Sequence, residues 1–531
     1  MFNDNENVYL RRNVLAEPLF NQWYAWPYLI APQTAAMYVA NWHLKIMQSF
    51  VAAPQTHAAA LKSPAMIGGP FMNYDASRTP EVKALLNRTV DEQADLLELA
   101  EGIRTLNLML SAEASGYSME PLYPRTPDCL RGLVELVYDM NNSPSVRFIE
   151  GLLYRSRFYK PSSQGMALSL IERDDRSFIL STPRLEQEGS VRINLPFSDE
   201  AYDLLFKMKV EPRPFSEIKE AVGVARDQAP AFAGFFTPHS HRRCEPFEGD
   251  GVRVRYFGHA CVVIESKDVA ILIDPLISYE YDSEVARFSF ADAPESIDYA
   301  LITHNHQDHC LLESLIQLRH KIKNIIVPKS AGGALADPSL KAILQNIGFR
   351  NVMEIDELQE IEIDGGSVTS VPFLGEHADL DIRTKTAHLV KLNGKTIMCA
   401  ADSNNIEPRL YERIKPIVGD VDALFLGMEC VGGPLTWLYG PLFTKPLARK
   451  MDQTRRFTGS DYARASEMVK TLNPKHVYVY AMGHEPWLTF LLSINYTPDS
   501  PQITESNRLV EECQSRGITS ERLFGRKTIL L

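Results

Sequence analysis

One segment of the chain reads Thr303-His304-Asn305-His306-Gln307-Asp308-His309 and places three imidazoles and one carboxylate within six residues. It directly follows the apolar run 299–302, which is typical of a buried strand. Without a bound cation these groups would crowd a half-buried loop as unpaired charges, at a cost of several kcal/mol. The alternative is a solvated histidine-rich loop, but the ligand spacing is specific and later residues complete a site. The segment therefore predicts a metal site at the end of a strand.

Further ligand candidates follow other apolar runs in the same half of the chain. They are Glu376 and His377 after 371–373, Asp402 after 396–401, and His484 after 477–482. A rigid sheet can aim side chains from several strand ends at one point. One such residue alone is usually a turn residue, but several beside the histidine-rich segment indicate a shared metal site.

The composition is that of an ordinary globular protein with two or three domains. The chain has 531 residues, of which 45% are apolar and 23% charged. The net charge of −12 argues against a general nucleic-acid binder, which needs a basic face. No apolar run is long enough to span a membrane, and the polar residues 1–6 do not resemble a signal peptide. Seven scattered cysteines without a Cys-x-x-Cys motif fit a reducing compartment, so we predict a cytoplasmic protein.

Two regions of different texture are expected, with residues 1–245 as a mixed α/β domain ending in a proline-rich linker and residues 246–531 as the catalytic domain. Helices are predicted over 34–50, 81–110 and 128–140, and a strand over 146–149. The aromatic cluster of residues 20–28 is predicted to be core and not a binding surface. From residue 252 strand pairs come first, and helices then alternate with strands, which fits two sheets with helices packed outside.

Residues 252 to about 531 resemble the metallo-β-lactamase fold, an αββα sandwich with a two-metal site. The fold's His-x-His-x-Asp-His signature matches His304, His306, Asp308 and His309, its bridging aspartate matches Asp402, and its final histidine matches His484. The segments around His259 and Asp274 are similar to the fold's early strands. Asp274 is expected behind the ligands or in a structural role, and His259 near the site without being a sure ligand. The expected fold class is α+β with this αββα sandwich at the C-terminus.

The chain resembles a narrower group within this fold, the diiron β-hydroxylases of nonribosomal peptide pathways, which include arylalanine hydroxylases of chloramphenicol biosynthesis. The resemblance rests on Glu376 where most members of the fold place a histidine, on the large N-terminal half and on the overall length. It implies that His304, His306 and Glu376 hold one iron, that Asp308, His309 and His484 hold the other, and that Asp402 bridges them.

Two residues remain open at this point. If His377 is the ligand in place of Glu376, the site reverts to the set found in hydrolases of the fold. Glu429 is similar to an additional, catalytic carboxylate of the group, but a buried structural acid fits equally well. A set of four imidazoles and three carboxylates favours iron or manganese over zinc.

The resemblance implies a non-haem diiron monooxygenase. Such an enzyme uses dioxygen and an external electron donor to hydroxylate the β-carbon of an amino acid that is tethered as a thioester to the carrier domain of a peptide synthetase. A para-aminophenylalanyl thioester is one candidate, and an aliphatic amino acid such as leucine is another. The expected partners are this carrier domain, a redox protein and a second copy of the chain, with neither nucleic acid nor membrane. A dinuclear metal hydrolase of a lactone, thioester or phosphoester is the alternative, followed by a scaffold protein with a vestigial metal site.

Overall fold

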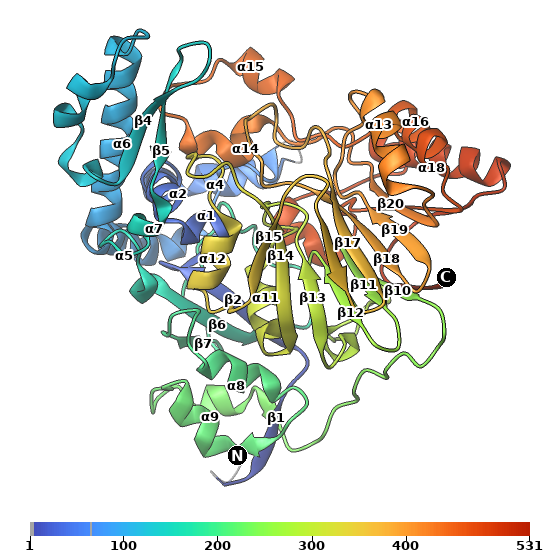
Figure 1. Cartoon of the computed structure of the whole chain (residues 1–531). Helices are drawn as coiled ribbons and strands as arrows, with labels where there is room; N and C mark the ends of the chain where they lie inside the picture. The colour runs from blue at the N-terminus through green and yellow to red at the C-terminus, as the bar shows by residue number, and fades with distance from the viewer. Residues whose placement is uncertain (1–4, 64–65) are drawn as a thin grey trace.

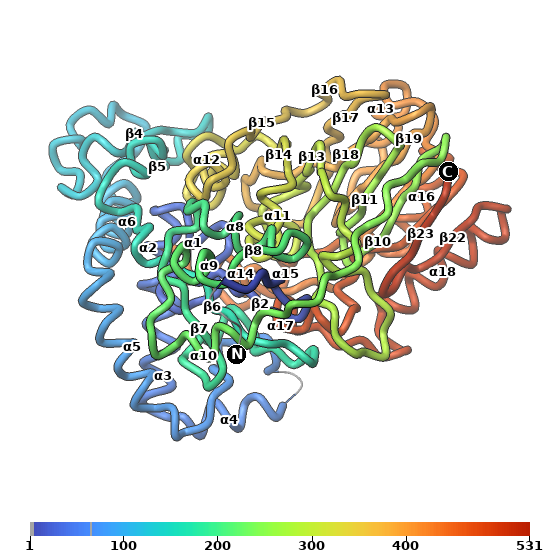
Figure 2. Tube along the Cα trace, turned by 90° about the horizontal axis from the view of Figure 1, so that it is seen from below, coloured from blue at the N-terminus to red at the C-terminus, as the bar shows by residue number. Residues whose placement is uncertain are grey.

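The structure is a computed structural model that describes residues 5–63 and 66–531 (Figure 1). Two seven-stranded sheets lie face to face in the C-terminal part of the chain. Figure 2 shows the N-terminal half, coloured blue to green, gathered on one side of this sandwich, with α16 and α18 on the other side.

The first sheet is antiparallel at one edge and parallel at the other. Strands β12 to β15 pair in parallel, whereas β10 to β12 pair as antiparallel neighbours. The order across the sheet is β15 (Val352–Ile355), β14 (Ile322–Pro328), β13 (Ile297–Leu301), β12 (Ala270–Ile273), β11 (Cys261–Glu265), β10 (Arg253–Gly258) and β23 (Lys527–Leu530). The central strands are almost wholly apolar because both faces of the sheet are covered.

The second sheet repeats this plan. Its parallel strands are β19 to β22, so the carboxyl ends of these strands share one edge. The order is β16 (Glu360–Ile363), β17 (Gly366–Val371), β18 (Ala387–Leu392), β19 (Lys395–Cys399), β20 (Ala423–Gly427), β21 (His476–Tyr480) and β22 (Thr519–Arg522).

Helices cover the outer faces of the sandwich. The inner faces meet in a core that includes Val262, Ile264, Val390 and Phe425. The helices of this part are α11 (Leu312–Leu318), α12 (Leu340–Asn346), α13 (Arg409–Val418), α14 (Leu435–Tyr439), α15 (Arg449–Thr454), α16 (Tyr462–Leu472), α17 (Thr489–Leu492) and α18 (Pro501–Ser515). Apolar residues of α11 and α12 pack on the first sheet, and those of α13, α16 and α18 pack on the second. The predicted αββα sandwich is confirmed.

The N-terminal half is mixed α and β, as predicted. Its strands are β1 (Asn7–Leu10), β2 (Val14–Phe20), β3 (Trp23–Tyr24), β4 (Val134–Tyr138), β5 (Pro144–Phe148), β6 (Gln164–Leu170), β7 (Val191–Ile193), β8 (Arg213–Pro214) and β9 (Phe236–Thr237). Its helices are α1 (Pro27–Ile30), α2 (Pro32–Tyr38), α3 (Leu44–Ala52), α4 (Pro54–Ala60), α5 (Thr79–Glu92), α6 (Ala94–Glu113), α7 (Glu150–Leu153), α8 (Ala201–Lys207), α9 (Phe215–Ala221) and α10 (Ala229–Ala233).

The helix predicted over 128–140 is wrong. Residues 134–138 form β4, which pairs with β5 in an antiparallel hairpin. Gly132 has a φ of 74°, which ends the preceding turn, and Val134 and Leu136 then bury alternate side chains. The closely spaced apolar residues fit the spacing of a helix and also the alternation of a strand, so the pattern alone could not decide between the two.

The two halves of the chain share one hydrophobic core. Trp23, Tyr24, Trp26 and Tyr28 are at most 2% exposed, which confirms that these aromatic residues are core. They belong to the same buried cluster as the residues of α11 and the outer face of the first sheet. Along the described residues, no helix combines the length and the apolar character needed to cross a bilayer.

Candidate metal centre

The chain turns sharply at the strand ends that surround the histidine-rich segment. His259, Asp274, Glu376, Ala401 and Ala481 follow five different strands and have positive φ values between 43° and 67°. This left-handed conformation is unfavourable for residues with a side chain, and such strain is concentrated at functional sites. Five strained turns at one edge of the sandwich mark that edge as the site.

The ligand candidates meet at this edge with their donor atoms close together. His309 Nε2 lies 3.0 Å from Asp402 Oδ2 and 3.7 Å from Asp308 Oδ2. His304 Nε2 lies 3.8 Å from the same Asp402 oxygen, and His306 Nδ1 lies 2.9 Å from Glu376 Oε1. Among the described residues, the groups that could hold an ion are His259–Asp308–His309, His304–His309–Asp402 and His304–His306–Glu376.

Unsatisfied polar atoms show that these residues fit a pair of metal ions. His304 Nε2, His309 Nε2 and Asp402 Oδ1 are buried and make no hydrogen bond within the described chain. Buried polar groups are otherwise hydrogen-bonded, so donor atoms left open toward one another indicate a cation between them. The mixture of imidazole and carboxylate donors suits iron.

The electrostatics of these residues lead to the same conclusion. Burial and the nearby Asp402 and Asp308 carboxylates raise the pKa of Glu376 well above its usual range. Burial alone would lower the pKa of His309, but the Asp402, Asp308 and Asp274 carboxylates raise it well above its usual range. Both shifts favour a proton on Glu376 and on His309, and bound cations would replace these protons.

Asp274 lies behind the cluster, as predicted from the sequence. Its Oδ2 accepts hydrogen bonds from His309 Nδ1 at 2.8 Å and from Thr303 Oγ1 at 2.6 Å, and its Oδ1 accepts from the Thr303 N–H at 2.7 Å. A carboxylate on the far nitrogen fixes the tautomer of a histidine, so His309 presents the lone pair of Nε2 to the cluster.

His259 approaches the cluster through Asp308. Its Nε2 lies 3.0 Å from Asp308 Oδ2, while its Nδ1 accepts a hydrogen bond from the Gly483 N–H at 3.1 Å. Because Nδ1 must carry a lone pair to accept this bond, the neutral ring has its proton on Nε2 and donates it to Asp308. In this arrangement His259 orients Asp308, with which it shares a candidate ion group.

The predicted role of His484 as an iron ligand stays a prediction. In the described chain His484 belongs to no candidate ion group and does not line the cavity beside the cluster. Its ring contacts Phe524 and Tyr496, with centroid distances of 4.9 and 5.5 Å. In the turn that precedes it, the Gly483 N–H donates a hydrogen bond to His259.

Glu376 joins a candidate ion group, whereas His377 does not. His377 Nδ1 instead lies 3.0 Å from the Tyr439 hydroxyl and 3.1 Å from His306 Nε2. The Tyr439 hydroxyl also lies 3.0 Å from His306 Nε2, so a buried tyrosine and histidine together orient His306. The sequence analysis missed Tyr439, because it comes from α14 and no ligand spacing points to it.

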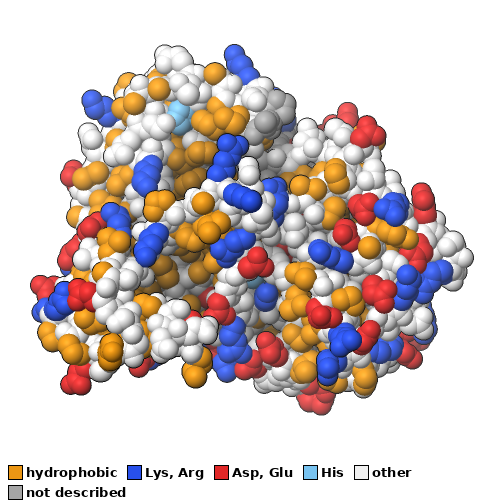
Figure 3. All heavy atoms as spheres, turned by 90° about the horizontal axis from the view of Figure 1, so that it is seen from above, with side chains coloured by type: hydrophobic (Ala, Val, Ile, Leu, Met, Phe, Trp, Pro, Cys, Tyr) orange, Lys and Arg blue, Asp and Glu red, His pale blue; other side chains and the backbone are white. Residues whose placement is uncertain are grey.

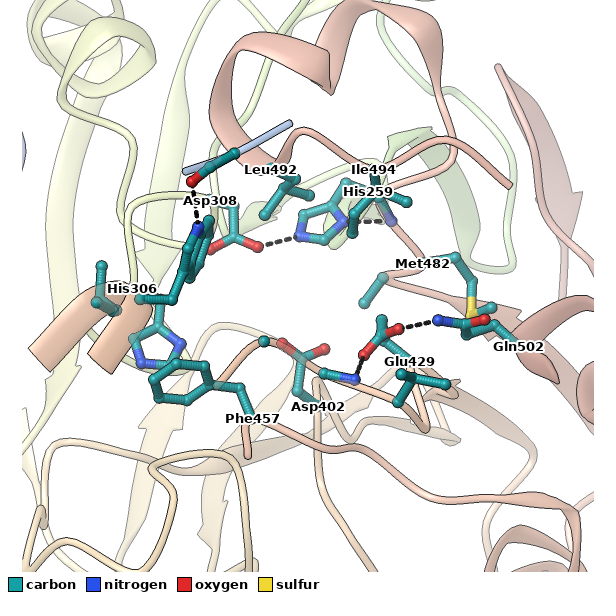
Figure 4. Close-up of a pocket in the computed structure, with 18 of the residues that line it drawn as sticks. His259, His306, Asp308, Asp402, Glu429, Phe457, Met482, Leu492, Ile494 and Gln502 are labelled. Carbon is teal, nitrogen blue, oxygen red and sulfur yellow. Dashed lines mark hydrogen bonds and ion pairs between the residues drawn. The ribbon is translucent and has the colours of Figure 1, made fainter. Parts of the chain in front are cut away.

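Glu429 follows β20 and lines the cavity beside the cluster, where Figure 4 shows it next to Asp402. The Gly432 N–H and Gln502 Nε2 both donate hydrogen bonds to its carboxylate. Burial raises the pKa of Glu429 and Asp402 adds to this, whereas the two hydrogen bonds oppose it. Glu429 is therefore close to the ligands but belongs to none of the candidate ion groups of the described chain.

A cavity of about 420 Å³ opens directly onto the cluster. His306, Asp308 and Asp402 form part of its wall (Figure 4), and Glu376 also lines it. The apolar part of the wall consists of Ile67, Val431, Trp437, Leu438, Phe457, Met482, Leu492 and Ile494. Its size and its mainly apolar wall with a few polar groups are typical of a small-molecule site.

Comparison with known proteins finds matches that together extend over nearly the whole chain. Residues 9–239 match the family described as the diiron non-heme beta-hydroxylase N-terminal domain, and residues 270–433 match a beta-lactamase superfamily domain. The 4-amino-L-phenylalanyl-[CmlP-peptidyl-carrier-protein] 3-hydroxylase of Streptomyces venezuelae is 38% identical over 529 residues, which cover 98% of this chain and 99% of that protein.

A solved structure shows the same likeness. The crystal structure of CmlA, a diiron beta-hydroxylase from Streptomyces venezuelae, superposes with a TM-score of 0.93 at 37% identity, covering 99% of this chain and 100% of that chain. A metal-dependent hydrolase of Natranaerobius thermophilus is 25% identical over 185 residues, which cover only 35% of this chain and 73% of that protein. Sequence, fold and donor set together show that the chain belongs to the diiron non-haem β-hydroxylases and is a non-haem diiron monooxygenase.

Proposed function

We propose that this protein hydroxylates the β-carbon of an amino acid held as a thioester on the carrier domain of a peptide synthetase. The observation that supports it best is the cavity of about 420 Å³ that joins an apolar wall to the cluster of donor atoms. A cavity of this size accepts an aminoacyl group and leaves no room for the carrier domain, which stays outside. The related Streptomyces venezuelae enzyme is named for such a carrier-bound substrate.

His304, His306 and Glu376 would hold one iron, and Asp308 and His309, with His484 as the further predicted ligand, would hold the other. Asp402 would lie between them, because its Oδ2 is 3.8 Å from His304 Nε2 and 3.0 Å from His309 Nε2. The chain positions these ligands through Asp274, His259, Tyr439 and His377, which is how outer partners tune a metal site. When bound, the two irons supply the electron-transfer chemistry that lets dioxygen deliver one oxygen atom to a C–H bond.

The remaining work of the chain is to hold the substrate and exclude water. Trp437, Phe457 and Leu492 enclose the aminoacyl side chain, so its β-carbon is held against the ligands of the cluster. Glu429 is proposed to face the substrate from the polar wall, held by Gln502 and Gly432. A closed apolar wall also protects the reaction from solvent.

The side chain to be hydroxylated is proposed to be aromatic, with para-aminophenylalanine as the first candidate and leucine as the aliphatic one. Trp437 and Phe457 offer flat faces on which an aromatic ring can pack. Mass spectrometry of several aminoacyl carrier domains, incubated with the reduced enzyme and air, tests the proposal. A gain of one oxygen on the aminoacyl group of one carrier is expected, whereas hydrolysis of the thioester without oxygen uptake would reject it.

An external redox protein is proposed as the electron donor, because hydroxylation with one atom of dioxygen requires electrons from outside the substrate to reduce the other atom to water. We further propose that the N-terminal half, residues 1–245, shapes access to the site and forms a homodimer. Support for the first role is that Ile67 and Gly68 line the cavity and that Trp437 Nε1 donates a hydrogen bond to the Gly68 carbonyl at 3.1 Å. Light scattering of the purified protein tests the dimer, and cell fractionation tests the proposed cytoplasmic location.

A further inference from the structure

A basic segment borders the cavity of this acidic protein. Residues 445–456 contain five cations, Lys445, Arg449, Lys450, Arg455 and Arg456, against the single carboxylate of Asp452, whereas the whole chain carries a net charge of −12. We call these five cations the basic rim. Figure 3, which views the molecule from the side on which α15 lies, shows Lys and Arg side chains gathered across the middle of the face.

The basic rim is fixed to the mouth of the cavity. Arg456 donates hydrogen bonds from Nε to the Val431 carbonyl at 2.8 Å and from Nη2 to the Gly432 carbonyl. Val431 and Gly432 both line the cavity. The Phe457 N–H donates to the Gly433 carbonyl at 3.0 Å, and the Arg455 guanidinium donates to the Ala378 carbonyl at 2.8 Å. A partner that touches α15 therefore touches the entrance of the cavity.

The outer cations of the basic rim have no counter-charge. Within the described chain, Lys445, Arg449 and Lys450 are exposed and make neither an ion pair nor a hydrogen bond. Asp452 is the nearest acid in the sequence, but its two oxygens accept hydrogen bonds from the Thr436 N–H and Oγ1, each at 2.8 Å. Like charges held together on a rigid support attract an anionic partner and speed its association.

Exposed apolar side chains accompany these charges. Met451 on α15 is 57% exposed, and Ile67 and Val431 at the cavity wall are 50% and 38% exposed. Large apolar groups surrounded by charged groups are characteristic of a protein-binding surface. The mouth thus offers an apolar strip that leads into the cavity, with a cationic border on one side.

We infer that the basic rim is the docking surface for an acidic carrier domain, and that Ile67 and Val431 guide its thioester arm into the cavity. This inference rests on the proposed function, because only a tethered substrate requires docking beside the mouth. The arm carries a phosphodiester, which adds a further negative charge next to the rim. An acidic electron donor would also favour a basic surface, but it has no need of the cavity entrance.

The test compares two triple charge reversals that change the net charge equally. The variant K445E/R449E/K450E removes the unpaired part of the basic rim. The control K83E/R226E/K267E reverses three exposed cations that make no ion pair in the described structure and lie on other elements. The three measurements are KM and kcat for a loaded carrier domain, binding of that carrier by fluorescence anisotropy, and turnover of the same aminoacyl group on free pantetheine.

We expect the KM and the Kd for the carrier domain to be about ten-fold or more higher in the rim variant than in the wild type. Both constants should also depend much less on salt concentration in the rim variant. Its turnover of the pantetheine thioester should match the wild type, and the control should match the wild type in every measurement. An unchanged KM and Kd in the rim variant, or equal losses in both variants, would overturn the inference. A rim variant that is defective only in electron delivery would assign the surface to the redox protein instead.

The failure of the proposed function would look different. In that case the wild-type enzyme would hydroxylate no aminoacyl carrier, whatever the state of the basic rim. Hydroxylation by the wild type together with unchanged carrier binding in the rim variant would sink the docking surface and leave the function intact. If the wild type neither hydroxylates nor binds a carrier domain, both proposals fall.

Discussion

Replacing Asp274 by asparagine should weaken iron binding without unfolding the protein. The Asp274 carboxylate is fully buried and accepts hydrogen bonds from the Thr303 N–H, the Thr303 hydroxyl and His309 Nδ1. Asparagine retains one acceptor oxygen, and in either orientation of the amide its NH₂ group faces another donor. The variant therefore loses a charge-assisted hydrogen bond to a ligand, worth roughly 1.5–3 kcal/mol.

The same magnitude follows from the behaviour of metal sites. Removing an outer partner of a ligand typically lowers metal affinity about 10- to 100-fold, which corresponds to about 1.4–2.7 kcal/mol. The assay is the iron content per chain after dialysis against a graded series of chelator concentrations. We expect Asp274→Asn to release iron at a roughly 10- to 100-fold lower chelator concentration than the wild type.

A matched control is available on the same sheet. Asp298, near the start of β13, accepts a hydrogen bond from the Ala270 N–H at 2.9 Å and pairs with Lys323 at 2.7 Å. Asp298→Asn should leave iron retention unchanged, because the metal centre follows the other end of this strand. The reasoning would be refuted if Asp274→Asn kept its iron as firmly as the wild type, or if both variants lost iron equally.

The other predictions concern Glu376, His377, Tyr439 and His43. Glu376→Ala should abolish oxygenation and remove about one iron per chain, whereas His377→Ala should keep both irons at reduced affinity. Elemental analysis of the two variants distinguishes these results. The reverse pattern would assign the ligand to His377. Tyr439→Phe removes two hydrogen bonds of 3.0 Å and should lower iron affinity by roughly ten-fold in the same chelator titration. Unchanged iron affinity would contradict the role of Tyr439 in orienting His306. Burial lowers the pKa of His43 to about 3 from a value of 6.5 in the unfolded chain, so acid favours the unfolded state below pH 6.5. Denaturant titrations should show that this group lowers the free energy of unfolding by about 2 kcal/mol at pH 5, and His43→Phe should abolish this loss. An equally steep fall in the free energy of unfolding of that variant would contradict the assignment to His43.

The sequence predicted the sandwich and most of the cluster because both depend on local patterns. The short apolar runs and the tight spacing from His304 to His309 are visible without any knowledge of contacts. Asp402 and Glu376 could be placed because each directly follows an apolar strand, and parallel strands bring their carboxyl ends to one edge.

Local patterns say less where the path of the chain after a strand decides the contacts. His484 follows β21 just as Asp402 follows β19, yet only Asp402 belongs to a candidate ion group of the described chain. The spacing of residues around His259 does not mark it as part of a metal site. Its turn nevertheless lets one ring nitrogen accept a hydrogen bond from the Gly483 N–H while the other contacts Asp308. The His259–Gly483 pairing joins residues 224 positions apart and leaves no periodic signal.

The central claim is that two irons are held by this cluster and serve oxygen chemistry on a tethered amino acid. The most direct measurement is of iron content and of oxygen consumed per aminoacyl group modified, made on one enzyme preparation with a loaded carrier domain and an electron donor. The account predicts two irons per chain and one dioxygen consumed for each hydroxyl group formed. A protein that carries only zinc and consumes no oxygen under these conditions would contradict it.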